Sequence, residues 1–252
     1  MNRIDSPAPI HPASRRATPA QILRRSADRG MADHGWLRSA HTFSFAGYHD
    51  AAWMQFGVLR VINEDRVAPG EGFGTHGHRD MEIISYVLEG ALAHRDSMDN
   101  GSVIRPGDVQ RMSAGTGLTH AEYNESTHDW THFLQIWILP DRSGHPPSYA
   151  ERRFESASKR GRLRLVVSPD GRHDSLSLHQ DALMYAGLFD GTESATLEVA
   201  ADRRVWVQVA RGSIRVNDTR LEQGDGLGMV ATPRVHISHA EAAEILVFDL
   251  PH

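Results

Sequence analysis

An all-β sandwich or barrel is the fold class that this sequence predicts. From Trp36 onward, short runs rich in Val, Ile, Leu and aromatic residues alternate with Gly, Pro, Asp and Asn, which is the pattern of strands and turns. Few segments have the 3.6-residue period of an amphipathic helix. The two halves of the chain also carry similar short patterns, which favours two copies of one small barrel.

The apolar runs place strands in both halves of the chain. In the first half we expect strands at residues 55–61, 81–88, 91–95, 109–112 and 131–139. In the second half we expect them at residues 163–167, 183–189, 204–209, 213–216, 226–229 and 244–250. The connection between the halves, residues 141–161, is polar and contains Pro146 and Pro147, so we expect a domain boundary within it.

The internal repeat depends on Gly-centred patterns. Tyr86-Val-Leu-Glu-Gly90 and Val103-Ile-Arg-Pro-Gly-Asp108 precede strands in the first half, and Gln208-Val-Ala-Arg-Gly212 and Leu221-Glu-Gln-Gly-Asp225 do so in the second. Independent hairpins in one large sandwich are the alternative, but 252 residues accommodate two domains. We therefore expect a first barrel over residues 22–145 and a second over residues 146–252. Residues 1–21 are rich in Pro and Arg and faintly resemble a transit peptide; we favour a disordered extension.

Composition limits the functions that the chain can have. With no Cys, disulfides, thiolate zinc sites, iron–sulfur ligation and thiol catalysis are excluded, so any metal must have nitrogen and oxygen ligands. The net charge of −5 offers no general attraction to nucleic acid. No apolar stretch is long enough for a membrane span or a signal peptide, so we expect a cytoplasmic protein that binds neither nucleic acid nor membrane.

Two histidine-containing segments are the candidate site. In an extended chain His76 and His78 point to the same face, with Gly77 between them. His120 and Glu122 are likewise two residues apart. On neighbouring strands of a barrel these pairs would face each other across the interior and surround a small volume with three imidazoles and a carboxylate, a set that suits Fe(II), Mn, Ni, Cu or Zn.

The identity of the carboxylate ligand stays open at this point. If the strand that holds His76 and His78 continues regularly, Glu82 shares their face and competes with Glu122. A turn at Arg79 and Asp80 would break this parity, and Glu82 could then form a salt bridge or support a metal ligand without binding the metal itself.

These segments resemble the motifs of the cupin superfamily. Gly70-x5-His76-x-His78-x3-Glu82 followed by Gly90 is similar to the first cupin motif, and Gly107 through His120-x3-Asn124 is similar to the second, with Ser113 where many cupins have proline. Within cupins the chain most resembles the pirin family, and in particular the bacterial pirin-like quercetin 2,3-dioxygenases. The phrases that carry this resemblance include His41-Thr-Phe-Ser-Phe45, Gly74-Thr-His-Gly-His78, His94-Arg-Asp-Ser97 and Met112-Ser-Ala-Gly-Thr-Gly117.

The resemblance implies a bicupin, with two tandem jelly-roll (cupin) β-barrels and one metal ion in the first. By this likeness the metal ligands are His76, His78, His120 and Glu122, and Glu122 is also the candidate catalytic base. The second barrel is expected to be degenerate and to hold no metal, because Glu198 and Ala200 stand where the first histidine pair would be. His236 and His239 are then structural.

The resemblance also implies an activity. The expected function is a dioxygenase that cleaves flavonols such as quercetin with O2 and releases carbon monoxide, using one divalent transition metal ion. Fe(II) is the first choice, with Mn, Ni, Co, Cu or Zn as alternatives. A metal-binding redox sensor or transcriptional cofactor that acts through a regulatory protein partner is the second hypothesis, and a cupin for another small metabolite is the third. The family resemblance favours a monomer.

Overall fold

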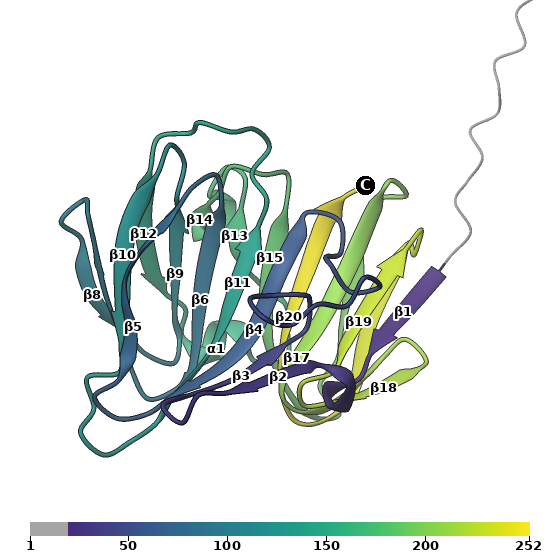
Figure 1. The fold of residues 1–252 in the computed structure, drawn as a ribbon. Coiled ribbons are helices and arrows are strands. Elements are labelled where there is room, and N and C mark those ends of the chain that lie inside the picture. Colours follow the sequence, from purple (N-terminus) through teal and green to yellow (C-terminus); the bar gives the residue numbers. More distant parts are fainter. Residues whose placement is uncertain (1–19) are drawn as a thin grey trace, which may run out of the picture.

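The computed structural model describes residues 20–252, and its regular structure is almost entirely β-strand, which confirms the predicted fold class (Figure 1). The strands form three sheets. The remaining regular segments are a short helix, α1 (Ser156–Lys159), and two turns of 3-10 helix, η1 (Ser26–Asp28) and η2 (Arg172–Asp174). Among residues 20–252, no helix has the length and apolar character needed to cross a membrane.

Two antiparallel sheets make the first barrel. The larger one contains β2 (Gly30–Asp33), β3 (Leu37–His41), β4 (Leu59–Val67), β6 (Glu82–Glu89), β9 (Asp108–Ser113), β11 (Thr131–Ile138) and β12 (Ser148–Arg153). The smaller one has the order β5-β10-β7-β8, formed by β5 (Gly72–His78), β7 (Leu92–Asp96), β8 (Gly101–Ile104) and β10 (Leu118–Tyr123). Apolar side chains from both sheets, among them Val87, Leu92 and Phe133, are buried together.

One sheet makes the second barrel. It contains β1 (Ala20–Arg24), β13 (Arg164–Ser168), β14 (Leu176–Ser177), β15 (Leu183–Gly191), β16 (Ala195–Glu198), β17 (Arg203–Val216), β18 (Thr219–Glu222), β19 (Gly226–Val230) and β20 (Arg234–Pro251). The long pairing of β17 with β20 has three shifts of register, and such irregularities bend strands. The sheet therefore closes over a core of its own side chains, including Val207 and Ile237.

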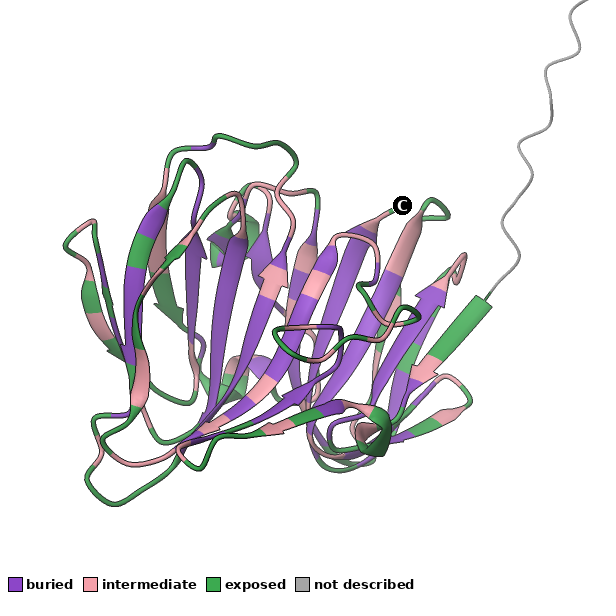
Figure 2. Ribbon diagram, viewed as in Figure 1, coloured by how far each residue is buried: buried purple, intermediate pink, exposed green. Residues whose placement is uncertain are grey.

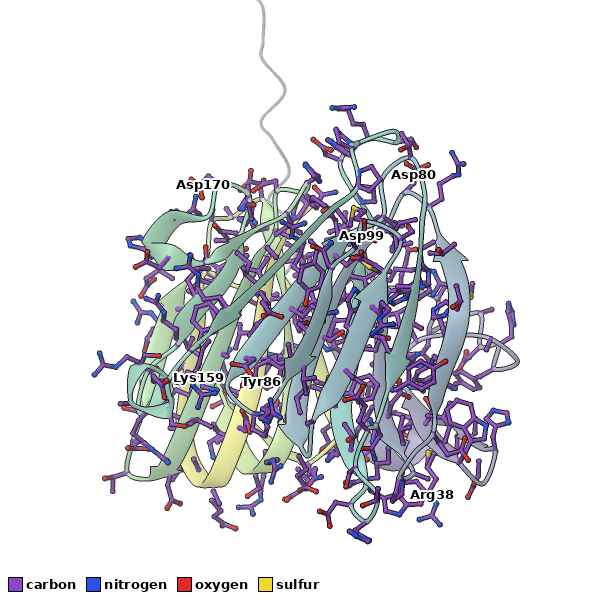
Figure 3. The ribbon with its side chains drawn as sticks, turned by 90° about the vertical axis from the view of Figure 1, so that its left-hand side faces the viewer. Arg38, Asp80, Tyr86, Asp99, Lys159 and Asp170 are labelled. Carbon is purple, nitrogen blue, oxygen red and sulfur yellow. The ribbon has the colours of Figure 1, made fainter. Side chains whose placement is uncertain are left out.

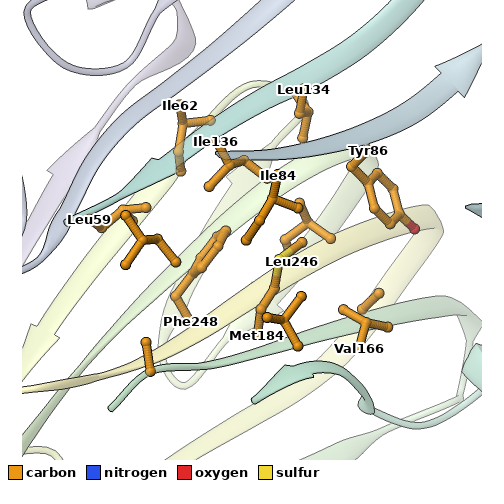
Figure 4. Close-up of a cluster of buried hydrophobic side chains, with 14 of the residues drawn as sticks. Leu59, Ile62, Ile84, Tyr86, Leu134, Ile136, Val166, Met184, Leu246 and Phe248 are labelled. Carbon is orange, nitrogen blue, oxygen red and sulfur yellow. The ribbon is translucent and has the colours of Figure 1, made fainter. Parts of the chain in front are cut away.

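The two barrels pack against each other through a large apolar core. Leu59, Ile84 and Ile136 from the first barrel lie against Met184 and Phe248 from the second (Figure 4). Strands at this contact are buried along most of their length (Figure 2). Because apolar area removed from water is the main stabilising contribution, we expect the barrels to fold as one unit.

A buried polar cluster also joins the barrels. The ammonium group of Lys159, which is 3% exposed, donates a hydrogen bond of 3.0 Å to Tyr86 Oη and lies 3.7 Å from the Glu244 carboxylate. Tyr86 Oη in turn donates to Glu244 over 2.5 Å. Figure 3 shows Lys159 beside Tyr86. The cluster connects α1, β6 and β20. Its two oxygen partners offset the free-energy cost of burying the ammonium group.

Strands cross the expected domain boundaries in both directions. β1 pairs with β19 of the second barrel, so Ala20 and Gln21 are in a strand although we expected them in a disordered extension; residues 1–19 lie outside the described residues. β12 follows the expected boundary at residue 146 but pairs with β9 of the first barrel. The strands therefore divide between the barrels differently from the expected ranges, 22–145 and 146–252. The second barrel includes β1 from the start of the chain, and the first barrel includes β12 from beyond residue 146.

Seven strands lie close to the ranges that the apolar runs predicted. β6, β7, β9, β11, β13, β15 and β19 lie within one or two residues of the expected ranges. The expected strand at residues 55–61 begins instead at Leu59, and residues 204–209 and 213–216 belong to a single long strand, β17. The strands that the apolar runs did not indicate include β1, β8 and β12, each of which has at most one buried residue.

Candidate metal centre

Three imidazoles meet where β5 pairs with β10. His76 and His78 lie on β5, and the antiparallel register places His120 of β10 directly opposite His76. The ring centroids are 4.7 Å apart for His76 and His78, 4.4 Å for His76 and His120, and 4.9 Å for His78 and His120. Each ring offers a nitrogen within 4.8 Å of the other two, which is a spacing that one metal ion can bridge.

The geometry differs in one respect from the arrangement expected from the sequence. The two pairs lie side by side on adjacent strands of one sheet, and not across the interior of the barrel. The parity argument itself holds for β5, since His76 and His78 share a face and Gly77 lies between them. Adjacent strands are about 4.8 Å apart, so opposite residues in a ladder come close enough to share a ligand.

Hydrogen bonds select the nitrogens that are available to a metal. The carbonyl oxygen of Gly74 accepts from His76 Nδ1 over 2.8 Å, so the lone pair of that ring is on Nε2. His120 Nε2 is buried and has no hydrogen-bond partner among residues 20–252. A buried nitrogen without a partner is costly, and coordination of a metal would satisfy it. The residues present therefore fit a metal ion.

A buried chain of side chains behind His120 sets its tautomer. His94 Nε2 donates to the Asp96 carboxylate over 3.2 Å. Burial raises the pKa of Asp96, but hydrogen bonds from Asn100, Met98 and His94 together keep it below its usual value. His94 Nδ1 is then an acceptor, and Gln110 Nε2 donates to it over 3.5 Å. His120 Nδ1 lies at the same distance from this nitrogen, so its proton points at His94 and Nε2 stays free.

The environment keeps the candidate ligands neutral. Burial and the neighbouring His76 lower the pKa of His78 to about 4. Burial, together with His76, His78 and His94, lowers the pKa of His120 to about 3. Imidazoles bind metals only in the neutral form, so at neutral pH both rings are ready to act as ligands.

Glu122 lies beside the histidines but faces a different set of neighbours. A bulge in β10 between His120 and Glu122 shifts the pairing with β5. Gln135 donates to the Glu122 carboxylate over 2.9 Å and Ser85 over 3.3 Å. Burial and the charge of Asp65 outweigh these bonds and raise the pKa of Glu122 to about 7.

The four expected ligands do not form one compact group. The close groups are His76, His78 and His120, and separately His94, His120 and Glu122. His120 belongs to both. The structure therefore brings the three imidazoles together, and it places the carboxylate at the edge of this set and next to a fourth imidazole, that of His94.

Glu82, the rival carboxylate, lies elsewhere. β5 ends at His78, Asp80 has a positive φ of 48°, and β6 begins at Glu82. This is the turn that would break the parity. Glu82 accepts hydrogen bonds from Ser113 over 2.7 Å and from His179 over 3.1 Å, and it belongs to neither close group.

An open cavity adjoins the histidines. It has a volume of about 490 Å³ and includes His76, His78 and Glu122 in its wall. The wall is otherwise rich in aromatic side chains, namely Trp36, Phe45, Phe73 and Trp137. Its further polar side chains are few, namely Asn63, Asp65 and Gln135. Apolar cavities of this size with a few polar groups are typical of small-molecule sites. We call it the metal cavity.

The corresponding positions of the second barrel have other partners. Glu198 forms an ion pair of 2.8 Å with Arg234, and His236 Nδ1 lies 3.1 Å from Thr196 Oγ1. His239 Nδ1 lies 3.0 Å from Ser238 Oγ. Within the described part of the chain, both groups of potential ligands are in the first barrel.

Sequence reasoning assigned no role to several residues around this site. His94 and Asp96 are two apart on β7 and point to one side of the sheet, and this His-x-Asp spacing could have indicated them. Ser85 and Gln135 carry no such signal, because the residues next to each of them and two positions away are apolar or aromatic.

Comparison with known proteins gives consistent matches over most of the chain. The pirin family matches residues 23–138, and the quercetinase C-terminal cupin domain matches residues 165–250. The chain is 46% identical over 229 residues to a protein of Escherichia coli (strain K12) named quercetin 2,3-dioxygenase, covering 91% of this chain and 98% of that one.

Solved structures show the same likeness. The crystal structure of YhhW from Escherichia coli has a TM-score of 0.89 at 45% identity and covers 92% of this chain and 98% of that one. The bacterial pirin YhhW in complex with nickel(II), also from Escherichia coli, has a TM-score of 0.88 at 45% identity and covers 92% and 99%. These matches confirm the expected fold of two cupin barrels.

Proposed function

The chain belongs to the pirin family of bicupin proteins, and on this basis we propose that it is a metal-dependent dioxygenase that cleaves flavonols such as quercetin with O2 and releases carbon monoxide. The observation that carries the proposal is the convergence of three imidazoles beside an aromatic cavity, with His76 and His78 in its wall. The name of the Escherichia coli relative supports the substrate class.

In this proposal His76, His78 and His120 hold the metal through their free nitrogens, and Glu122 is the fourth ligand. Three nitrogen donors and one oxygen donor accept most divalent first-row ions. We propose Fe(II) as the first choice, with Mn, Ni, Co, Cu and Zn as alternatives; the related pirin YhhW was solved with nickel(II). When bound, the ion would lower the pKa of the enol hydroxyl of the substrate and hold its oxygen in place.

The protein's own groups then bind the substrate and move its proton. Glu122 is the proposed general base, because its carboxylate lines the cavity and can accept the proton of the enol hydroxyl. Gln135 and Ser85 hold the carboxylate on the cavity wall. The rings of Trp36 and Phe73, which meet edge to face at 5.3 Å, exclude water and align a flat substrate.

The second barrel is proposed to be a scaffold without metal. Its strands β15 and β20 pack against the first barrel through the shared apolar core. Its histidines, His236 and His239, are bonded to local hydroxyl groups, which is consistent with a structural role.

The test is a turnover assay on the full chain, purified without a histidine tag and reconstituted with each candidate metal. We expect loss of the flavonol absorbance of quercetin that requires both metal and O2, with carbon monoxide as a product. His76→Ala should abolish the reaction, while His236→Ala, a matched change in the second barrel, should leave it intact. Absence of turnover with all six metals at full loading would refute the proposal.

A further inference from the structure

A second cavity lies directly beside the metal cavity. It has a volume of about 420 Å³. The two cavities have part of their walls in common, and the shared residues are Phe45, Asn63, Asp65 and Phe73. The second cavity extends from there along β2 and β3, past Ser39, His41 and Tyr48. A ligand at the histidines could therefore continue past the shared wall.

The shared wall contains two buried polar side chains, Asn63 and Asp65. They are two apart on β4, so they point to the same side of the sheet. Asn63 is 3% exposed and Asp65 is 4% exposed. No cationic side chain among residues 20–252 forms an ion pair with Asp65. A carboxyl group in such a position is costly unless something donates to it.

Each of these side chains uses only one of its two polar atoms within the protein. Asn63 Oδ1 accepts from His41 Nδ1 over 2.9 Å, so the amide nitrogen points elsewhere. Asp65 Oδ1 accepts from Ser39 Oγ. Among the residues that the structure describes, Asn63 Nδ2 and Asp65 Oδ2 have no partner, and neither atom is sealed away from solvent. A free donor and a free acceptor therefore face the cavities together.

This pair matches a hydroxyl group on an aromatic ring. A phenolic hydroxyl donates one hydrogen bond and accepts another, so it can donate to Asp65 Oδ2 and accept from Asn63 Nδ2. The apolar surroundings, including Phe45 and Phe73, suit the ring itself. A site built to bond a substrate hydroxyl discriminates strongly against an analogue that lacks it, because its own polar groups then stay unpaired.

We propose that the second cavity is the part of the substrate site that receives the hydroxylated ring remote from the metal, and that Asn63 and Asp65 select for its hydroxyl groups. The inference rests on the proposed function, since it places the reacting ring of a flavonol at the histidines. The substrate class is thereby narrowed to two-part polyphenols with a hydroxylated pendant ring.

The test compares two flavonols, quercetin, whose pendant ring carries hydroxyls, and galangin, whose pendant ring has none. Binding to the nickel-loaded full chain is measured by calorimetry under nitrogen, so that O2-dependent turnover cannot interfere. We expect the wild type to bind quercetin roughly 10-fold to 100-fold more tightly than galangin. Asp65→Asn and Asn63→Ala should remove most of this preference, because they should weaken the binding of quercetin and leave that of galangin unchanged.

Two further variants separate selection from loss of folding. Asp33→Asn is the matched control, since it removes an exposed carboxylate of β2 that lines neither cavity. It should bind like the wild type. Ala32→Leu leaves the polar pair intact and narrows the second cavity, and it should weaken both flavonols by at least about 10-fold, since a filled cavity excludes the ring.

The outcomes are distinct for the two proposals. The inference would be overturned if Asp65→Asn weakened the binding of quercetin and of galangin equally, or if Ala32→Leu bound both flavonols as tightly as the wild type. A preserved preference for quercetin without any aerobic turnover would support the binding site and refute the dioxygenase proposal.

Discussion

Replacement of His94 tests how the site prepares its ligands. His94→Phe keeps a flat ring against Tyr149, which now lies 4.9 Å from the His94 ring, but removes the acceptor for His120 Nδ1. The Nδ1 proton of a metal-bound His120 would then be buried without a partner. Because the lost bond is long, at 3.5 Å, we assign it about 1–2 kcal/mol, which corresponds to roughly 5-fold to 30-fold weaker metal binding.

His94→Asn is the matched variant. Its side-chain oxygen stands at the same distance from the backbone as Nδ1 of the histidine, so it keeps an acceptor for His120 and loses the stacking on Tyr149. Competition titration with a chelator gives the metal Kd of both variants. We expect Phe at position 94 to weaken binding and Asn to restore most of it; the reverse order would show that packing, and not the tautomer of His120, is what His94 supplies.

Three other predictions follow from single side chains. Glu122→Gln should keep most of the metal, measured by elemental analysis, and lose quercetin turnover; full activity would exclude the proposed base. The hydrogen bond from His132 and the charge of Arg29 outweigh burial and lower the pKa of Glu64 to about 2 from 4.5, so its carboxylate stabilises the fold above pH 4.5 and this contribution is lost as the pH falls toward 2. Glu64→Gln should therefore cost about 3 kcal/mol of unfolding free energy at pH 7 and much less near pH 3, and a pH-independent loss in urea titrations would contradict this. Lys159→Met should destabilise the protein by about 3 kcal/mol, because Glu244 loses a buried partner, and an unchanged melting temperature would argue against that role.

Local spacing predicted the parts of the site that depend on one strand. His76 and His78 share a face because a strand has a period of two, and the turn at Asp80 that removes Glu82 was one of the two alternatives that the spacing allowed. The direct pairing of His76 with His120 could not be derived, because the register between β5 and β10 depends on contacts far apart in the chain.

The features that the sequence concealed depend on which strands lie beside one another. Asn63 and Asp65 lie in the polar run Asn63-Glu64-Asp65-Arg66 of β4, where no spacing distinguishes them, and their free atoms become visible only when β2 and β3 enclose a cavity beside them. The bulge that turns Glu122 toward Gln135 is likewise a property of the paired strands. The crossing of β1 and β12 between barrels was hidden for the same reason, since the partner of a strand depends on contacts between residues far apart in the chain.

Anomalous diffraction from crystals of the metal-loaded protein, recorded at the absorption edge of the metal, would locate the bound ion. We expect one peak, in the first barrel, within coordination distance of His76, His78 and His120 and at the edge of the metal cavity, with Glu122 as the fourth ligand. A peak between His94, His120 and Glu122, or one in the second barrel, would contradict this expectation.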